Sequence, residues 1–188
     1  MANLFIIHSY NADTKESFGP YLVKKGKELD LNVIFPDFPT RKEASYKKWS
    51  EIMNQYLISG DLNGESIIVA HSLGTHFIPK YLAEKNIAVK LFISCAGFLN
   101  DHSGRDDLNW LVDQFKPNSK EIDKAIDLIE NRYSIYSNND HMNPQQELED
   151  YADRFKAIKT FIPDIGHLGK ISGITELPQV LEIIENVL

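Results

Sequence analysis

Residues 67–76 read Ile67-Ile68-Val69-Ala70-His71-Ser72-Leu73-Gly74-Thr75-His76. A β-branched run ends there at Ala70, and a pattern with helical spacing follows Gly74. A strand, one sharp turn and a helix with a serine at the tip form a nucleophile elbow, whose strained turn requires small neighbours. The stretch therefore predicts Ser72 as a nucleophile. The rest of the chain must then supply a base, an acid that orients it and two N–H groups for an oxyanion.

The composition favours one globular domain over residues 1–188. A net charge of −7 gives no electrostatic support to nucleic-acid binding, and no apolar run approaches the roughly 20 residues of a membrane span. The N-terminal residues lack the basic start of a signal peptide, and the single cysteine, Cys95, permits no intrachain disulfide. We therefore expect a cytoplasmic protein without a membrane or nucleic-acid partner.

Short apolar runs predict six strands, at residues 4–8, 32–35, 66–70, 89–94, 133–137 and 158–162. Segments with apolar residues at helical spacing separate them, and one of these runs from Ile122 to Ile129. Strands that alternate with helices indicate an α/β fold, in which a mostly parallel sheet carries helices on both faces. Reactive residues are then expected in the loops at the carboxyl ends of the strands.

Two prolines, each inside or beside a helical pattern, mark features of the predicted helices. Pro79 lies inside the helical pattern after the elbow and should kink it, because proline removes a backbone hydrogen bond. Asn143 followed by Pro144 and Gln146 resembles an N-cap, a first-turn proline and a capping-box partner. We expect a helix to begin there.

The predicted strand ends carry a serine, an aspartate and a histidine in the order of an α/β-hydrolase. Ser72 would attack a carbonyl carbon, His167 would accept and return the serine proton, and Asp140 would hold the histidine tautomer. One oxyanion N–H should come from Leu73, the residue after the nucleophile. The other should come from the loop after the first strand, where Tyr10 is the candidate.

Other polar residues at strand ends have competing interpretations. Asp164 precedes the histidine by three residues and is a rival acid, whereas the Pro-Asp-Phe-Pro setting of Asp37 favours a structural turn. We expect His71 to pack or to form hydrogen bonds, and His8 to anchor a loop. Cys95 is expected in the core.

The segment 98–118 is less regular and is a candidate for a short lid. Phe98 and Trp110 are candidate residues of a substrate pocket. Trp110 and Phe115 would either line that pocket or pack in a satellite cluster at the edge of the sheet, and the pattern does not separate these two possibilities. No cysteine cluster or paired carboxylates indicate a metal, and no phosphate-binding glycine loop indicates a nucleotide cofactor.

The chain resembles the small serine hydrolases of the retinoblastoma-binding protein 9 and YdeN type over nearly its whole length. The motifs that carry the resemblance are His8-Ser9-Tyr10, Pro36-Asp37-Phe38-Pro39, Val69-Ala70-His71-Ser72-Leu73-Gly74, Ser137-Asn138-Asn139-Asp140 and Asp164-Ile165-Gly166-His167-Leu168. The resemblance implies a compact α/β-hydrolase fold with strand order 2-1-3-4-5-6, with Ser72, Asp140 and His167 as the triad. Strands one and three would then be neighbours, which would bring Tyr10 beside Ser72.

Two residues depart from the pattern of that family. Ala70 replaces the first glycine of the general elbow, and Ser9 stands where the family more often has glycine. If the Ser9 position requires a positive φ, a serine there would be strained.

The leading hypothesis is a serine hydrolase that cleaves a small carboxylic ester, with amides and thioesters as further candidates, through an acyl-enzyme at Ser72. Its partner would be a small-molecule acyl substrate, and it would need no cofactor. The alternative is a protein-interaction module that keeps the hydrolase fold with little or no turnover. A flavodoxin-like binding domain is excluded because His8-Ser9-Tyr10 replaces a phosphate loop.

Overall fold

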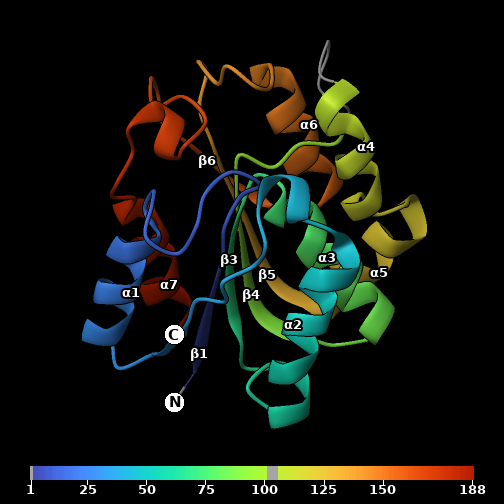
Figure 1. Ribbon diagram of the computed structural model, residues 1–188. Helices are drawn as coiled ribbons and strands as arrows, with labels where there is room; N and C mark the ends of the chain where they lie inside the picture. Colours follow the sequence, from blue (N-terminus) through green and yellow to red (C-terminus); the bar gives the residue numbers. More distant parts are fainter. Residues whose placement is uncertain (1, 101–105) are drawn as a thin grey trace.

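The computed structural model describes residues 2–100 and 106–188 and contains one six-stranded parallel sheet (Figure 1). The strand order β2-β1-β3-β4-β5-β6 confirms the predicted topology. The strands are β1 (Asn3–Ile7), β2 (Asn32–Ile34), β3 (Ile67–His71), β4 (Val89–Cys95), β5 (Ile129–Tyr136) and β6 (Ile158–Phe161). The start of β5 was predicted too late, because Ile129 continues the helical spacing of the preceding segment. In the structure Ile129 pairs with Val89 instead.

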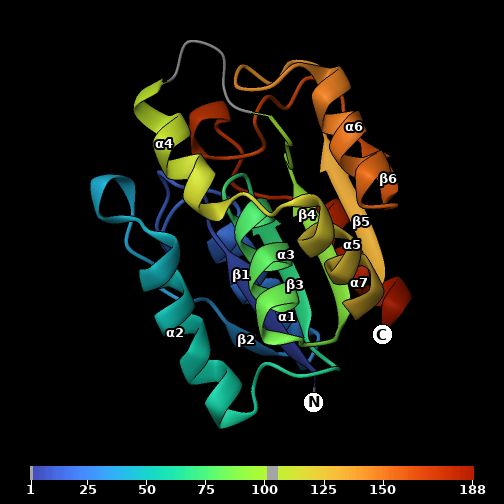
Figure 2. The ribbon, with the colours of Figure 1, turned by 90° about the vertical axis from the view of Figure 1, so that its right-hand side faces the viewer.

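Helices cover both faces of the sheet, as predicted. On one face lie α1 (Gly19–Glu28) and α7 (Pro178–Val187), and on the other lie α2 (Tyr46–Ser59), α3 (Gly74–Lys85), α5 (Ser119–Leu128) and α6 (Gln145–Arg154) (Figures 1 and 2). The remaining helix, α4 (Asp106–Phe115), stands at the carboxyl edge of the strands (Figure 2). None of the helices in the described ranges is both long and apolar enough to cross a membrane.

The alternation of side chains along β1 shows how the two layers form. Leu4 and Ile6 are buried toward α1 and α7, whereas Phe5 and Ile7 are buried toward α2 and α3. Successive side chains of a strand point to opposite faces, so a continuous apolar run belongs to a strand that is covered on both sides.

The adjacency of β1 and β3 positions the loop after β1 beside the elbow. Ile7 pairs with Ala70, and α3 begins so close to this loop that a Cβ on Gly74 would lie 2.9 Å from Ile7 Cγ2. The same Cβ would lie 3.2 Å from the carbonyl oxygens of Ile7 and His8. The glycine is therefore required for the close approach of the helix to the loop.

Pro79 does not end α3, which continues to Lys85. Proline has no N–H to donate to the carbonyl four residues earlier, that of Thr75. The Tyr151 hydroxyl, from α6, donates to this carbonyl oxygen at 2.9 Å. The Tyr151 ring packs directly against Gly97. A Cβ at position 97 would clash with a carbon of this ring, so the contact requires glycine.

The predicted cap of α6 is wrong in detail. Pro144, not Asn143, is the N-cap residue, and no side chain caps this end. The Asn143 N–H instead donates to Asp140 Oδ1 at 3.1 Å, and Gln146 bonds to Asp150 within the helix. Of the candidate lid, 98–118, residues 101–105 lie outside the described residues, and α4 forms most of the described part.

Candidate active site

Ser72 lies in the left-handed region of the backbone, with φ of 51°, as an elbow serine should. Its N–H donates to the carbonyl of Cys95 at 2.9 Å. Its own carbonyl accepts from the N–H and the hydroxyl of Thr75, at 2.8 and 2.6 Å. A non-glycine residue in this region is strained by about 1–2 kcal/mol, so these bonds are needed to hold it. Cys95 itself is buried in the core, and burial raises the pKa of its thiol.

Ser72, His167 and Asp140 form one continuous hydrogen-bonded chain. His167 Nδ1 lies 2.7 Å from Asp140 Oδ2, and His167 Nε2 lies 3.0 Å from Ser72 Oγ. Because a carboxylate only accepts, Nδ1 carries the proton and Nε2 is left to accept from the serine hydroxyl. The Asp140 side chain is fully buried and that of His167 is 9% exposed, so the chain lies largely out of water.

Two backbone groups hold the Asp140 carboxylate in its ionised form. Its Oδ1 accepts from the N–H of Met142 at 2.7 Å and from that of Asn143 at 3.1 Å. Burial alone would raise the pKa of Asp140, but the bond with His167 and these two N–H groups outweigh it and lower the pKa. Asp140 therefore stays negative beside the histidine.

The rival acids have other positions. The Asp164 carboxylate accepts from the Asn138 amide at 3.3 Å, and the Asp164 N–H donates to the Asn138 side chain at 2.8 Å. Asp164 is exposed, as is Asp37. Neither forms a hydrogen bond with His167, so geometry distinguishes Asp140 from both.

Hydrogen bonds of its backbone groups hold the loop that carries His167. The His167 N–H donates to Ser172 Oγ at 2.7 Å, and its carbonyl accepts from His71 Nε2 at 2.7 Å. The Gly166 N–H donates to Asn139 Oδ1 at 2.6 Å. In the sequence Asn139 stands out only as part of the Ser137-Asn138-Asn139-Asp140 motif, and Ser172 does not stand out at all, because a lone serine in a loop has no periodic signal.

The two predicted oxyanion donors, Tyr10 and Leu73, face the same cavity as Ser72. Within the described part of the chain neither N–H has a backbone acceptor. Ser9 is not among the residues with positive φ, so the strain considered for it is absent. The adjacent His8 anchors the loop: its Nδ1–H donates to the Ser9 carbonyl at 2.8 Å, and its Nε2 accepts from the Phe38 N–H at 3.2 Å. Burial lowers the pKa of His8 and keeps it neutral.

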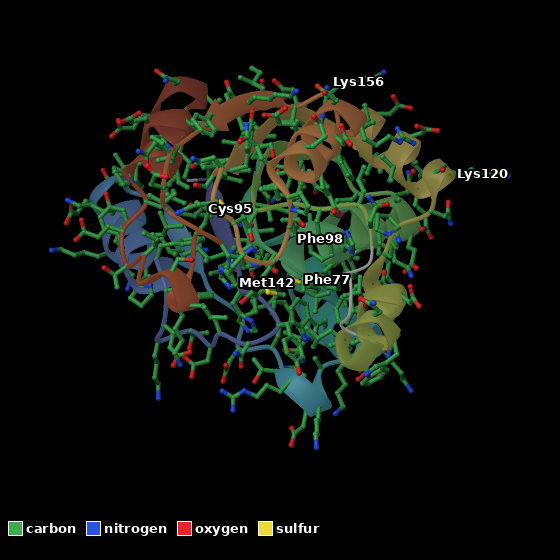
Figure 3. The ribbon with its side chains drawn as sticks, turned by 90° about the horizontal axis from the view of Figure 1, so that it is seen from above. Phe77, Cys95, Phe98, Lys120, Met142 and Lys156 are labelled. Carbon is green, nitrogen blue, oxygen red and sulfur yellow. The ribbon has the colours of Figure 1, made fainter. Side chains whose placement is uncertain are left out.

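A small cavity of about 70 Å³ opens at Ser72. It is lined by Ser9, Tyr10, Asn11, Ser72, Leu73, Phe98, Leu108, Leu111, Val112, Met142, His167 and Ile171. Phe98 and Met142 reach it from two different loops at the carboxyl edge (Figure 3). Apart from Ser72, His167 and the 9–11 loop, the residues that line the cavity are apolar.

One of the two predicted pocket residues does not line this cavity. Phe98 does, but Trp110 points away from it and is 54% exposed. The side of α4 that faces the cavity carries Leu108, Leu111 and Val112. Trp110 lies about 100° around the helix axis from Leu111. Phe115 is buried in an aromatic cluster with Tyr46, Trp49 and Phe77.

No metal centre competes with this arrangement in residues 2–100 and 106–188, which hold no group of three His, Cys, Asp or Glu side chains placed to bind an ion.

The model of the serine hydrolase family matches residues 5–186. The chain belongs to the serine hydrolase family. This serine hydrolase is 24% identical over 183 residues to the protein YdeN of Bacillus subtilis (strain 168), a match that covers 96% of this chain and 93% of YdeN. The family predicted from the elbow and its partner motifs is thereby confirmed.

Solved structures share the fold. The crystal structure of the ydeN gene product from B. subtilis superposes with a TM-score of 0.86 at 24% identity, covering 100% of this chain and 98% of that one. Est1E from Butyrivibrio proteoclasticus, with ferulic acid bound, gives 0.71 at 14% identity, with coverage of 100% and 89%. A thermophilic esterase from Thermogutta terrifontis, with malate bound, gives 0.67 at 14% identity, with coverage of 100% and 90%. At these identities the likeness establishes the fold.

Proposed function

We propose that this serine hydrolase cleaves small carboxylic esters through an acyl-enzyme at Ser72. The observation that carries the proposal is the hydrogen-bonded chain from Ser72 through His167 to Asp140, which ends at an apolar cavity. A nucleophile, a base and an acid that orients the base are the set that acyl transfer requires.

In the first half-reaction the Ser72 oxygen bonds to the ester carbonyl carbon while its proton moves to His167 Nε2. The N–H groups of Leu73 and Tyr10 donate to the oxyanion that forms. The tetrahedral species collapses, the bond to the alcohol oxygen breaks, and His167 returns the proton to the departing alcohol. Water then repeats the sequence against the acyl-enzyme and releases the carboxylic acid.

The shape and polarity of the cavity support a short, uncharged acyl group. About 70 Å³ gives room for only a few carbon atoms, and none of the described lining residues is a lysine, arginine, aspartate or glutamate. A charged acyl chain would lose its hydration without gaining a partner. Amides and thioesters of the same acyl groups are further candidates, because the triad acts on the carbonyl carbon in each of them.

The proposal is tested by labelling with a fluorophosphonate probe and by turnover of p-nitrophenyl acetate. We expect the native protein to be labelled and to hydrolyse the ester, and the Ser72→Ala variant to do neither. Ser59→Ala, at an exposed serine on α2, is the matched control and should behave as wild type. Labelling that survives Ser72→Ala would refute the nucleophile.

Acyl-chain length tests the cavity separately. Along a series of p-nitrophenyl esters, kcat/KM should be highest for short chains and should fall once the chain exceeds the cavity. Met142→Ala removes a partly buried side chain from the wall and should shift the optimum toward longer chains. An optimum at a long acyl chain in the native protein would contradict the cavity argument.

The alternative, a protein-interaction module with little turnover, predicts no probe labelling at Ser72 and no ester hydrolysis, so the same experiment separates the two functions.

The single buried cysteine is compatible with a reducing compartment, and we propose a cytoplasmic location, which cell fractionation would test.

A further inference from the structure

His71 immediately precedes the nucleophile, and its side chain is not among those that line the cavity at Ser72. The residue is 5% exposed, and its Nε2 lies 2.7 Å from the carbonyl oxygen of His167. A carbonyl only accepts, so Nε2–H donates and His71 is in the Nε2-protonated tautomer. The bond joins the backbone of the catalytic base to the elbow itself.

The loop that carries the base depends on such bonds. Gly166 and Leu168, on either side of His167, are both left-handed, with φ of 58° each. Leu168 is not a glycine, so its conformation is strained and persists only where neighbours hold it. Of the hydrogen bonds within the described residues, two join the loop at 162–169 to the elbow at 67–74. One is the bond between Ser72 and His167, and the other is the bond from His71.

The His71 ring has a tightly defined position. Its centroid lies 5.5 Å from that of Phe18 and 5.2 Å from that of His167. Gly169 lies against the ring, and a Cβ at this glycine would fall 2.5 Å from His71 Cε1. The absence of a side chain at Gly169 therefore lets the loop backbone close on the ring. Burial lowers the pKa of His71 to about 3, which keeps the ring neutral at physiological pH.

We propose that His71 is a positioning residue, which fixes the distance between His167 Nε2 and Ser72 Oγ by holding the His167 carbonyl against the elbow. The inference rests on the proposed function of Ser72 and His167. Ser72 moves with β3, whereas His167 lies on a loop after β6, three strands away in the sheet. The bond from His71 joins the loop to the residue beside the nucleophile. It thereby keeps the distance between His167 Nε2 and Ser72 Oγ constant.

Three variants separate hydrogen bonding from packing. His71→Leu removes the donor and leaves an apolar side chain. His71→Gln replaces the ring by a chain whose amide N–H can reach the same carbonyl. Ile184→Ala, in the buried face of α7, destabilises the fold without touching the site and controls for lost stability. Thermal denaturation of all three establishes that each is folded at the assay temperature.

The readouts are the second-order rate of fluorophosphonate labelling and, for p-nitrophenyl acetate, kcat and KM. Misplacement of a reacting group by about 1 Å is worth about 100-fold in rate. We therefore expect His71→Leu to lower the labelling rate and kcat by roughly 10- to 100-fold with little change in KM. His71→Gln should recover to within about threefold of wild type, and Ile184→Ala should match wild type.

Two results would overturn the inference: labelling of His71→Leu at the wild-type rate, or a loss in His71→Gln as large as that in His71→Leu. Failure of the proposed function looks different, because wild type itself would then not be labelled. The proton resonance of the bond between His167 and Asp140 gives an independent readout. It should shift or broaden in His71→Leu and return in His71→Gln.

Discussion

Asp140→Asn is the most informative single substitution, because the contacts of the carboxylate dictate how the amide must sit. Oδ1 accepts from two backbone N–H groups, of Met142 and Asn143, and Oδ2 accepts from His167 Nδ1. An asparagine keeps the backbone bonds only if its oxygen takes the Oδ1 position. Its NH₂ group then faces His167.

The expected magnitude follows from the tautomer that this orientation imposes. An NH₂ group donates, so His167 Nδ1 must become the acceptor and the ring proton moves to Nε2. Nε2–H then points at Ser72 Oγ, 3.0 Å away, and cannot take the serine proton. Inversion of the tautomer with intact geometry costs about 10⁴-fold in kcat in triads of this kind. We expect a loss of 10³–10⁴-fold in kcat with little change in KM.

The assay is steady-state hydrolysis of p-nitrophenyl acetate by wild type, Asp140→Asn and the matched control Asp164→Asn. Asp164 lies three residues before His167 and is bonded to Asn138 instead. The control should therefore stay within about threefold of wild type, since surface changes away from special features have small effects. A loss below tenfold for Asp140→Asn, or a larger loss for Asp164→Asn, would refute the assignment of the acid.

Three further substitutions test the supports of the elbow. Tyr151→Phe leaves the buried Thr75 carbonyl without its 2.9 Å donor and should lower the free energy of unfolding by about 1–3 kcal/mol in urea titrations. Gly74→Ala places a Cβ 2.9 Å from Ile7 Cγ2 and should cost about 1–3 kcal/mol and slow probe labelling; a stable, fully labelled variant would contradict it. His71 has a folded-state pKa of about 3 against 6.5 unfolded, so between these pH values only the unfolded state takes its proton. Stability should fall as the pH drops from 6.5, by about 2 kcal/mol from this group at pH 5, and His71→Gln should reduce that slope.

The sequence predicts the fold and the family well because both depend on local patterns. Apolar runs buried on two faces specify parallel strands, and the α/β alternation restricts the connections. Ser72 stands in a turn whose small neighbours are visible in the sequence. Asp140 and His167 each follow a strand, and the carboxyl ends of parallel strands share one edge, so their convergence could be expected before the structure was known.

The errors have a different origin, in contacts between segments distant in the chain. The capping prediction for Asn143 is the exception, a local error: the N-cap residue is Pro144 and no side chain caps the helix, while the Asn143 N–H donates to the Asp140 carboxylate three residues earlier. Trp110 fails as a pocket residue because only one side of α4 faces the cavity. The Tyr151 hydroxyl on α6 donates to the Thr75 carbonyl on α3. No periodic pattern in the sequence predicts a contact between these two helices. Such contacts depend on register and rotation between elements, which single-sequence patterns do not carry.

Ser72 and His167, the proposed nucleophile and base, are held in different ways, and this contrast accounts for the tether that we propose at His71. Ser72 is strained, but its N–H is held by the Cys95 carbonyl on β4, and the Gly74 contact fixes the helix that follows, so the sheet itself positions it. His167 lies in the loop six residues beyond the end of β6 and is flanked by left-handed residues. A loop of this kind can open locally at low free-energy cost unless its backbone groups are held. The bond from His71 supplies that restraint from the residue next to the nucleophile, so the rigidity of the elbow extends to the base.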